Sequence, residues 1–216
     1  MARVKTGVLI SGTGSNLRAL LAAAEDPSYP AEISHVISNR PEAPGLAHAD
    51  AAGVSTSVIE DGMFASRPGF EAAITESLRA AGVELVIMAG FMRVLTTGFV
   101  DAWWNRALNI HPSLLPAFPG RHTHEQALAA GVRVAGCTVH FLREAVDAGP
   151  IVGQAAVPVH PDDTSDTLGR RVGAAEHRLL PHCLRLIAGG RARVEGERVR
   201  LDGSAVPDDP MLNPLP

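Results

Sequence analysis

LNIHPSLLP, residues 108–116, is the stretch that decides how the chain folds, and it continues as AFPGRHTH to residue 124. Its first residues predict a short buried strand, in which a two-residue period puts Asn109 and His111 on one face. Pro112 cannot donate to a sheet ladder, so we expect the strand to end at His111 and a rigid loop to follow. An amide and an imidazole are thus expected side by side at a strand end, where they suit chemistry on a carbonyl group.

Strand-like and helix-like runs alternate before this stretch. Strands are predicted at residues 4–10, 33–38, 54–59 and 85–89, and helices at residues 17–24, 46–52 and 70–80. This alternation predicts an α/β fold, a Rossmann-like and mostly parallel sheet flanked by helices. Ligands of such folds bind beyond the carboxyl ends of the strands. Residues 12–16, 90–95 and 111–116 fall there.

The second half of the chain predicts an extension of this sheet. Strands at residues 134–142 and 151–157, joined through a turn at 147–150, suggest an antiparallel hairpin. A short helix at 125–130 precedes it, and a long helix at 165–188 contains Pro181, which we expect to end or kink the helix. A small hairpin is predicted at 191–201. We expect one domain, residues 1–202, and an extended Pro-rich tail, residues 203–216.

The composition indicates a soluble, globular protein. Of the 216 residues 46% are hydrophobic and 19% are charged, which argues against a disordered, fibrous or membrane protein. Nucleic acid is an unexpected partner, because 19 Lys and Arg against 23 Asp and Glu leave no basic excess. Two cysteines and no predicted signal peptide or membrane span favour the cytoplasm.

The glycine-containing stretch SGTGSN, residues 11–16, lies between the first predicted strand and helix. Backbone N–H groups and the positive end of the helix dipole can bind a phosphate at such a junction. The third glycine of a dinucleotide fingerprint, expected near Leu17, and the Gly-Lys-Ser/Thr of a Walker loop are absent, so we expect a phosphomonoester site. A tight turn with a helix cap would explain the same residues equally well.

Other candidate residues keep two interpretations at this stage. Residues 90–95 combine apolar bulk with Arg93, which could face a cleft or solvent. His111, His122, His124 and His140 with Asp147 could form a zinc site, but ligand spacing is missing, and we expect all except His111 to be loop or core histidines. Trp103 and Trp104 are expected to be packing residues.

Asn109, His111 and Asp147 together favour acyl transfer without a covalent nucleophile. If an amine attacks a carbonyl-type carbon, Asn109 can donate to the developing oxyanion, and a protonated His111 can stabilise that charge and move protons. Asp147, at the tip of the predicted hairpin, would favour the imidazolium form of His111. The alternative is that His111 is structural, with its hydrogen bonds satisfied by neighbouring groups at the end of the strand.

The signature NIHPSLLP, residues 109–116, resembles that of the folate-dependent formyltransferases. Within this family, the pair SGTGSNL, residues 11–17, and FPGRHTH, residues 118–124, is similar to the members that act in purine synthesis. The resemblance extends from about residue 4 to 201. It implies that the formyl group of 10-formyltetrahydrofolate passes to the amine of 5'-phosphoribosylglycinamide, with no metal.

The resemblance also implies roles for individual residues. The matching catalytic residues are Asn109, His111 and Asp147; those for the phosphoribosylglycinamide substrate are Gly14, Ser15, Asn16 and Glu176; those for the folate are Arg67, Met92, Arg93, Val94, Leu95 and again Asn109. Loops 121–127 and 144–149 would close round the pterin. Gly173 departs from relatives that have a longer polar side chain. A monomer or homodimer is expected.

Two other functions stay open at this stage. One is a formyltetrahydrofolate deformylase, which would use the same cluster to hydrolyse the formyl donor without an acceptor. The other is a non-catalytic sensor that binds folate or a phosphorylated ligand on an α/β scaffold.

Overall fold

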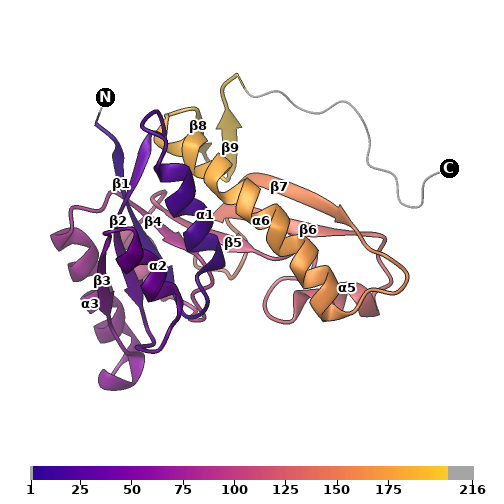
Figure 1. Cartoon of the computed structure of the whole chain (residues 1–216), viewed down its shortest axis with the longest axis horizontal. Coiled ribbons are helices and arrows are strands. Elements are labelled where there is room, and N and C mark those ends of the chain that lie inside the picture. Colours follow the sequence, from indigo (N-terminus) through magenta and orange to yellow (C-terminus); the bar gives the residue numbers. More distant parts are fainter. Residues whose placement is uncertain (1, 204–216) are drawn as a thin grey trace.

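The computed structural model describes residues 2–203, so the predicted tail lies outside the described residues except for Gly203. The chain forms a seven-stranded sheet in the order β3-β2-β1-β4-β5-β6-β7 and a separate two-stranded sheet of β8 and β9 (Figure 1). The strands are β1 Val4–Ile10, β2 Ala31–Ser38, β3 Ser55–Val58, β4 Leu85–Met88, β5 Ala107–His111, β6 Val134–Phe141, β7 Ile151–Pro158, β8 Ala192–Glu195 and β9 Arg198–Leu201.

Helices cover both faces of the large sheet (Figure 1). They are α1 Ser15–Ala24, α2 Gly45–Ala51, α3 Arg67–Ala80, α4 Thr97–Ala102, α5 Thr123–Ala129 and α6 Ser165–Ala188, with a short 3₁₀ helix, η1, at Asp61–Met63. Helices α1, α2 and α6 contribute to the core on one face, and α3 and α4 to the core on the other. None of the described helices is long and apolar enough to cross a membrane.

Strand β1 explains why the sheet is buried on both faces. Val8 and Ile10 belong to the core under α1 and α6, whereas Leu9 between them belongs to the core under α3 and α4. All three side chains are fully buried. A continuous apolar run is what a strand covered on both sides requires, so the predicted α/β sheet is confirmed.

The direction of the strands changes at β5. Strands β1 to β5 pair in parallel, whereas β5 pairs antiparallel with β6, and β6 antiparallel with β7. The predicted antiparallel hairpin is therefore confirmed, and so is the small terminal hairpin of β8 and β9. The loop of the β6–β7 hairpin starts beside the amino end of β5, where Phe141 pairs with Leu108, and Asp147 within it reaches back to His111 at the end of the strand.

Helix α6 has the predicted bounds and continues through Pro181 to Ala188. Of the two effects expected of this proline, an end of the helix is therefore not observed. Proline inside a helix costs about 3 kcal/mol, and burial of residues on both sides of it offsets this cost. The buried side chains are Leu168, Val172 and Leu180 before the proline and Cys183, Leu184 and Leu186 after it.

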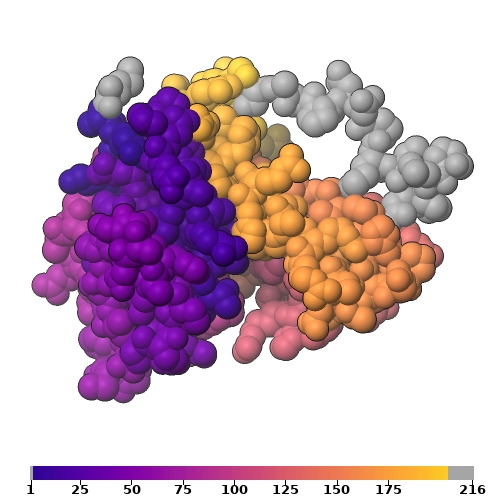
Figure 2. All heavy atoms as spheres, viewed as in Figure 1, coloured from indigo at the N-terminus to yellow at the C-terminus, as the bar shows by residue number. Residues whose placement is uncertain are grey.

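The order of strands creates a crevice between β1 and β4. The chain leaves β1 toward β2 on one side, and β4 later adds on the other side, so the connections diverge at this point. Ligand sites of open α/β sheets lie at such switch points. The carboxyl ends of β1, β4 and β5 lead into residues 11–16, 89–96 and 112–116. Figure 2 shows the surface indented between the indigo and purple N-terminal part and the pink and orange part that contains α5, β6 and β7.

Candidate active site

Strand β5 brings Asn109 and His111 to the carboxyl edge of the sheet. The strand ends at His111, as the following proline predicts. Asn109 is partly buried and His111 is 4% exposed. Neighbouring β4 and β6 hold the strand on both sides, so the two side chains are fixed by the sheet rather than by a flexible loop.

Asp147 reaches His111 from the loop between β6 and β7. Its Oδ2 atom lies 3.3 Å from His111 Nδ1, and its side chain is 8% exposed. The backbone N–H of Gly120 donates to the same Oδ2 at 2.8 Å. Asp147 has a left-handed backbone with φ of 56°, which is uncommon for a residue with a side chain. The three residues predicted as a catalytic cluster therefore lie together, and their roles stay predictions.

The hydrogen bonds of His111 indicate which protons it carries. Nε2 lies 3.0 Å from the carbonyl oxygen of Phe118, which can only accept, so Nε2 bears a hydrogen. Nδ1 faces the carboxylate of Asp147, which also accepts. Both ring nitrogens of His111 therefore face acceptor oxygens.

His140 is a fourth member of the cluster, and the sequence interpretation assigned it to the core. It is indeed 2% exposed, but its Nε2 lies 3.3 Å from Asn109 Nδ2 and 3.7 Å from Asp147 Oδ1. Its Nδ1 donates to the carbonyl oxygen of Phe141 at 3.0 Å. Burial lowers the pKa of His140, so the imidazole is neutral at pH 7 and Nε2 accepts from the Asn109 amide.

The antiparallel register is what brings His140 to the site. Asn109 pairs with His140, and His111 pairs with Thr138. Directly opposite residues on neighbouring strands present their side chains on the same face. The predicted hairpin was a signal for this contact. It falls short because periodicity alone leaves the register of two strands open.

The loop after β5 is held by polar side chains of the hairpin. Thr138 Oγ1 donates to the carbonyl oxygen of Ser113 at 2.7 Å and accepts from the N–H of Leu115 at 3.0 Å. Gln154 Nε2 donates to the carbonyl oxygen of Leu115 at 2.9 Å. These bonds fix the chain that follows His111, so the loop forms a rigid side of the site.

The glycine-containing loop leads into α1 without a side-chain cap. Gly14 is the N-cap, with φ of 70°, and glycine has no side chain to donate or accept. A Cβ atom at Gly14 would also come within 2.6 Å of Gly45 Cα, at the start of α2. Packing against α2 therefore requires this glycine, in addition to any ligand. The first N–H groups of α1 lack a capping side chain, which suits an anion at this helix end.

Asn16 and Glu176 meet beside this loop although 160 residues separate them. Asn16 Nδ2 donates to Glu176 Oε2 at 2.8 Å. Burial raises the pKa of Glu176, and the hydrogen bond from Asn16 partly opposes this. The Oδ1 atom of Asn16 is buried and has no hydrogen-bond partner among the described residues. Gly173, one turn earlier on α6, faces open space.

The loop between β4 and α4 divides its side chains between core and surface. Met92 and Val94 are 64% and 57% exposed, whereas Leu95 is buried in the core with Phe91. Arg93 does not extend freely into solvent, because its Nη2 forms a 2.5 Å ion pair with Asp61 Oδ2 of η1.

Arg67 is exposed at the first position of α3. Phe70, one turn further along this helix, stacks on Phe91 of the 90–95 loop with ring centroids 6.4 Å apart. Residues three apart lie on the same face of a helix, so Arg67 is on the side of α3 that faces the loop.

The remaining histidines of the zinc interpretation have other contacts. His122 Nδ1 pairs with Glu125 Oε2 at 2.9 Å, and both side chains are exposed. His124 packs against Gly169 of α6, where an added Cβ would meet its ring at 3.2 Å. Within residues 2–203, no group of three or more His, Cys, Asp or Glu residues is arranged to hold a metal ion.

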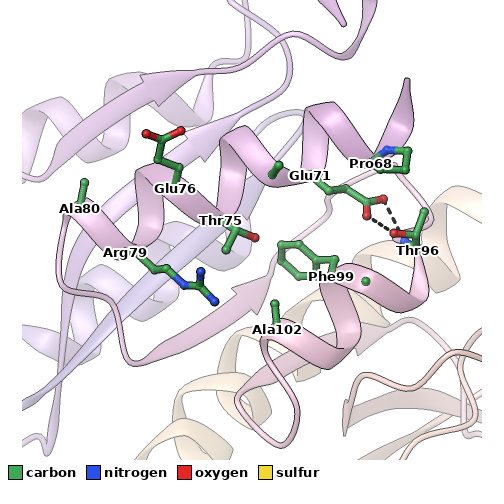
Figure 3. A pocket seen from close by; sticks show the side chains of 11 residues that line it. Pro68, Glu71, Thr75, Glu76, Arg79, Ala80, Thr96, Phe99 and Ala102 are labelled. Carbon is green, nitrogen blue, oxygen red and sulfur yellow. Dashed lines mark hydrogen bonds between the residues drawn. The ribbon is translucent and has the colours of Figure 1, made fainter. Parts of the chain in front are cut away.

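A separate groove of about 660 Å³ lies between α3 and α4 (Figure 3). Buried Glu71 accepts hydrogen bonds there from the N–H and hydroxyl of Thr96, which precedes α4. The groove contains none of the predicted site residues, and Glu71 satisfies the start of α4. We therefore assign this carboxylate to the anchoring of the 90–96 segment.

Residues 4–184 match a protein family described as formyl transferase. The chain is 39% identical to a protein of Escherichia coli strain K12 named phosphoribosylglycinamide formyltransferase, over 93% of this chain and 94% of that protein. It is 50% identical to a protein of Gallus gallus named trifunctional purine biosynthetic protein adenosine-3, over 89% of this chain, and spans 19% of the length of that protein.

A solved structure is also similar along almost its whole length. It is described as glycinamide ribonucleotide transformylase 1 from Symbiobacterium toebii, with a TM-score of 0.90 and 50% sequence identity. The match covers 93% of this chain and 94% of that chain.

Proposed function

The chain belongs to the formyl transferase family, and from this premise we propose that it is a phosphoribosylglycinamide formyltransferase. It transfers the formyl group of 10-formyltetrahydrofolate to the amine of 5'-phosphoribosylglycinamide, a step of purine biosynthesis. The observation that carries the proposal is the cluster of Asn109, His111, His140 and Asp147. The Asn16–Glu176 pair, whose Asn16 lies at the start of α1 after the carboxyl end of β1, supports it. An amide, an imidazolium and a carboxylate next to an anion-binding helix end suit transfer to a phosphorylated amine.

The reaction replaces one carbon–nitrogen bond by another. The acceptor amine attacks the formyl carbon, and the carbonyl oxygen becomes an oxyanion in the tetrahedral intermediate. Asn109 Nδ2 has two hydrogens, and His140 accepts one of them. The second hydrogen can donate to the oxyanion. A donor that is already oriented stabilises developing charge without further reorganisation.

His111 and Asp147 manage the protons. When its bond to the formyl carbon breaks, N10 of the folate takes a proton from protonated His111. The neutral ring then takes the proton that the attacking nitrogen loses, so His111 returns to its starting form. The Nε2–H of His111 can reach a substrate when it turns from the Phe118 carbonyl, its present acceptor. Asp147 stabilises the imidazolium through Nδ1 and keeps the ring oriented.

Two sides of the cluster fit two ligands. We assign the phosphate of the acceptor to the backbone of Gly14, Ser15 and Asn16, because uncapped N–H groups lie there. Glu176 and the unpaired Oδ1 atom of Asn16 suit the ribose hydroxyls, since both accept hydrogen bonds.

We assign the folate to the opposite side. The exposed side chains of Met92 and Val94 offer apolar contacts, Arg93 and Arg67 can hold carboxylates, and Leu95 contributes through its backbone. Loops 121–127 and 144–149 would close round the pterin ring.

The organisation of the chain fits a small cytoplasmic enzyme. We propose that residues 1–202 act as one domain, as a monomer or homodimer, without a metal. Support for the compartment comes from Cys137 and Cys183, which are buried and unpaired in the structure.

The direct test follows the absorbance of 10-formyltetrahydrofolate with purified protein. We expect rapid loss of the formyl donor when phosphoribosylglycinamide is present and no loss when it is omitted. Formylated glycinamide ribonucleotide should appear in equal amount. Loss of the donor without the acceptor would instead identify a hydrolase and contradict the proposal.

A further inference from the structure

A closed network of hydrogen bonds joins the loop after β1 to the loop after β4. The N–H of Met92 donates to Ser11 Oγ at 2.8 Å, and the Ser11 hydroxyl donates to Asn39 Oδ1 at 2.6 Å. Asn39 Nδ2 donates to Asp61 Oδ1 at 3.3 Å. Asp61 Oδ2 then pairs with Arg93 at 2.5 Å. The network begins and ends on adjacent residues of one loop.

Each side chain in this network has one orientation that satisfies its neighbours. A carboxylate can only accept, so the NH₂ group of Asn39 must face Asp61, and its oxygen must face Ser11. The Ser11 hydroxyl then uses its single hydrogen toward Asn39 and its lone pairs toward Met92. Exchanging donor and acceptor at Asn39 would place two acceptor oxygens face to face at Asp61 and break that bond.

The network runs from the interior to the surface. Ser11 and Asn39 are each 5% exposed, whereas the side chains of Asp61 and Arg93 are 33% and 46% exposed. Burial acts to raise the pKa of Asp61, but hydrogen bonds from Arg93 and Asn39 outweigh it and hold the pKa below its usual value. The ionised carboxylate can thus direct the Arg93 guanidinium at the edge of the site.

The same network has a second anchor in the backbone. The N–H of Ser11 donates to the carbonyl oxygen of Gly90 at 3.2 Å, and Gly12 directly follows Ser11. At its other end, the 90–96 segment is tied by Thr96 to Glu71. The middle of the segment, which includes exposed Met92 and Val94, therefore depends on Ser11 and on the pair Asp61–Arg93 for its position.

We infer that Asn39 is a positioning residue for the folate side of the site: it orients Ser11 and Asp61, and through them the backbone of Met92 and the guanidinium of Arg93. This inference rests on the proposed function for the identity of the ligand. Asn39 lies behind the loop and acts through its neighbours. Its loss should weaken the binding of folate and leave the chemical step at Asn109 and His111 intact.

The test compares Asn39→Ala, Asn39→Asp, Asp61→Asn and the double variant Asn39→Asp/Asp61→Asn. We expect Asn39→Ala to raise the KM for 10-formyltetrahydrofolate about tenfold, roughly the effect of one hydrogen bond to a charged group. The kcat and the KM for phosphoribosylglycinamide should stay within about twofold of wild type.

The double variant separates positioning from general loss of stability. Asn39→Asp puts a second carboxylate next to Asp61 and should raise the folate KM at least as much as Asn39→Ala. In the double variant, the carboxylate introduced at position 39 can accept from Ser11 and from the amide introduced at position 61, so donor and acceptor are exchanged but paired. We expect its folate KM to return to that of Asp61→Asn alone, as a double-mutant cycle measures.

His35→Leu is the matched control, because His35 lies on β2, the strand that leads to Asn39, and outside this network. It should lower the melting temperature and leave the folate KM unchanged. The inference is overturned if Asn39→Ala changes the folate KM by less than twofold or raises both KM values equally. It is also overturned if the double variant is no better than Asn39→Asp.

Hydrogen exchange of the Met92 amide distinguishes failure of this inference from failure of the proposed function. Inactive wild-type protein would contradict the proposed function alone. Faster exchange at Met92 in Asn39→Ala than in His35→Leu would then still support the positioning role, and equal exchange would overturn it.

Discussion

His35 on β2 and His140 on β6 are both almost fully buried, and burial lowers the pKa of both imidazoles. Their partners differ. His35 Nδ1 lies 2.7 Å from Ser55 Oγ, and its Nε2 lies 3.1 Å from Ser57 Oγ and 3.0 Å from Ser77 Oγ. His140 contacts the amide of Asn109 and lies near the carboxylate of Asp147.

The hydrogen-bond partners of His35 give it a structural role and require no part in catalysis. Ser55 Oγ donates to the carbonyl oxygen of Ser34 at 3.0 Å, so it accepts from His35 Nδ1–H. Ser57 or Ser77 can then donate to Nε2. A neutral imidazole surrounded by hydroxyls is fully satisfied.

The comparison teaches that burial and a lowered pKa do not by themselves identify a functional histidine. His140 differs because its acceptor nitrogen orients a group at the carboxyl edge of β5, where the loops of the crevice meet. His35 lies on β2 and contacts side chains of β3 and α3. Position relative to the strand ends separates the two roles.

The largest effect should come from Asn109→Ala. It removes the amide that His140 orients, and we expect kcat to fall by about 10²–10³, as for the loss of one oxyanion donor. Both KM values should change little. Steady-state kinetics measure the fall in kcat. His35→Leu, which replaces the buried histidine outside the site, is the control. A kcat close to wild type would contradict the role given to Asn109.

Replacement of His140 should have a smaller effect, because Asn109 remains. His140→Leu leaves the Asn109 amide without its acceptor, and we expect kcat to fall roughly tenfold, the equivalent of one hydrogen bond. His140→Gln should retain more activity, since a terminal oxygen can accept near the former Nε2 position. If both variants lose activity equally, orientation of Asn109 is not the role of His140.

His35 should influence stability and its dependence on pH. The folded state has the lower pKa, so the neutral form is favoured on folding, and this stability is present above the unfolded pKa of about 6.5. It is lost as the pH falls below that value toward the folded pKa. Urea unfolding between pH 8 and pH 5 should therefore show a shallower loss of stability in His35→Gln than in wild type. An equal slope would argue that His35 is not neutral in the fold.

Ser77→Ala should have the smallest effect. Ser57 can still donate to His35 Nε2, so one partner remains and the free energy of unfolding should fall by about 0.5–1 kcal/mol. Activity should be unchanged. Denaturant unfolding checks this value, and the double variant Ser57→Ala/Ser77→Ala, which removes both donors, should lose clearly more than the sum.

Much of the fold could be predicted because its signals are local. Continuous apolar runs indicated the buried strands, and glycines and prolines indicated their ends, as with Pro112 after β5. The observed strand β1 has the predicted bounds, and the other predicted strands of the large sheet agree within two residues at each end. Pro181 does not end α6, because burial on both sides outweighs a local preference.

The candidate site could be predicted in part. Asn109 and His111 share a face by strand periodicity, and the turn before β7 indicated Asp147. His140 could not be assigned to the site, because the register between β5 and β6 is a tertiary property. Asn39 gave no signal, since it connects Ser11 and Asp61 across sequence separations of 28 and 22 residues.

The sequence by itself determined which segments become strands, where they end, and which polar groups stand at those ends. These features depend on side-chain period, proline and glycine, which act over a few residues. The tertiary structure decided which of these groups meet: His140 with Asn109, Glu176 with Asn16, and Gly14 with Gly45. Such contacts depend on strand register and helix packing, which are settled when the whole core is filled.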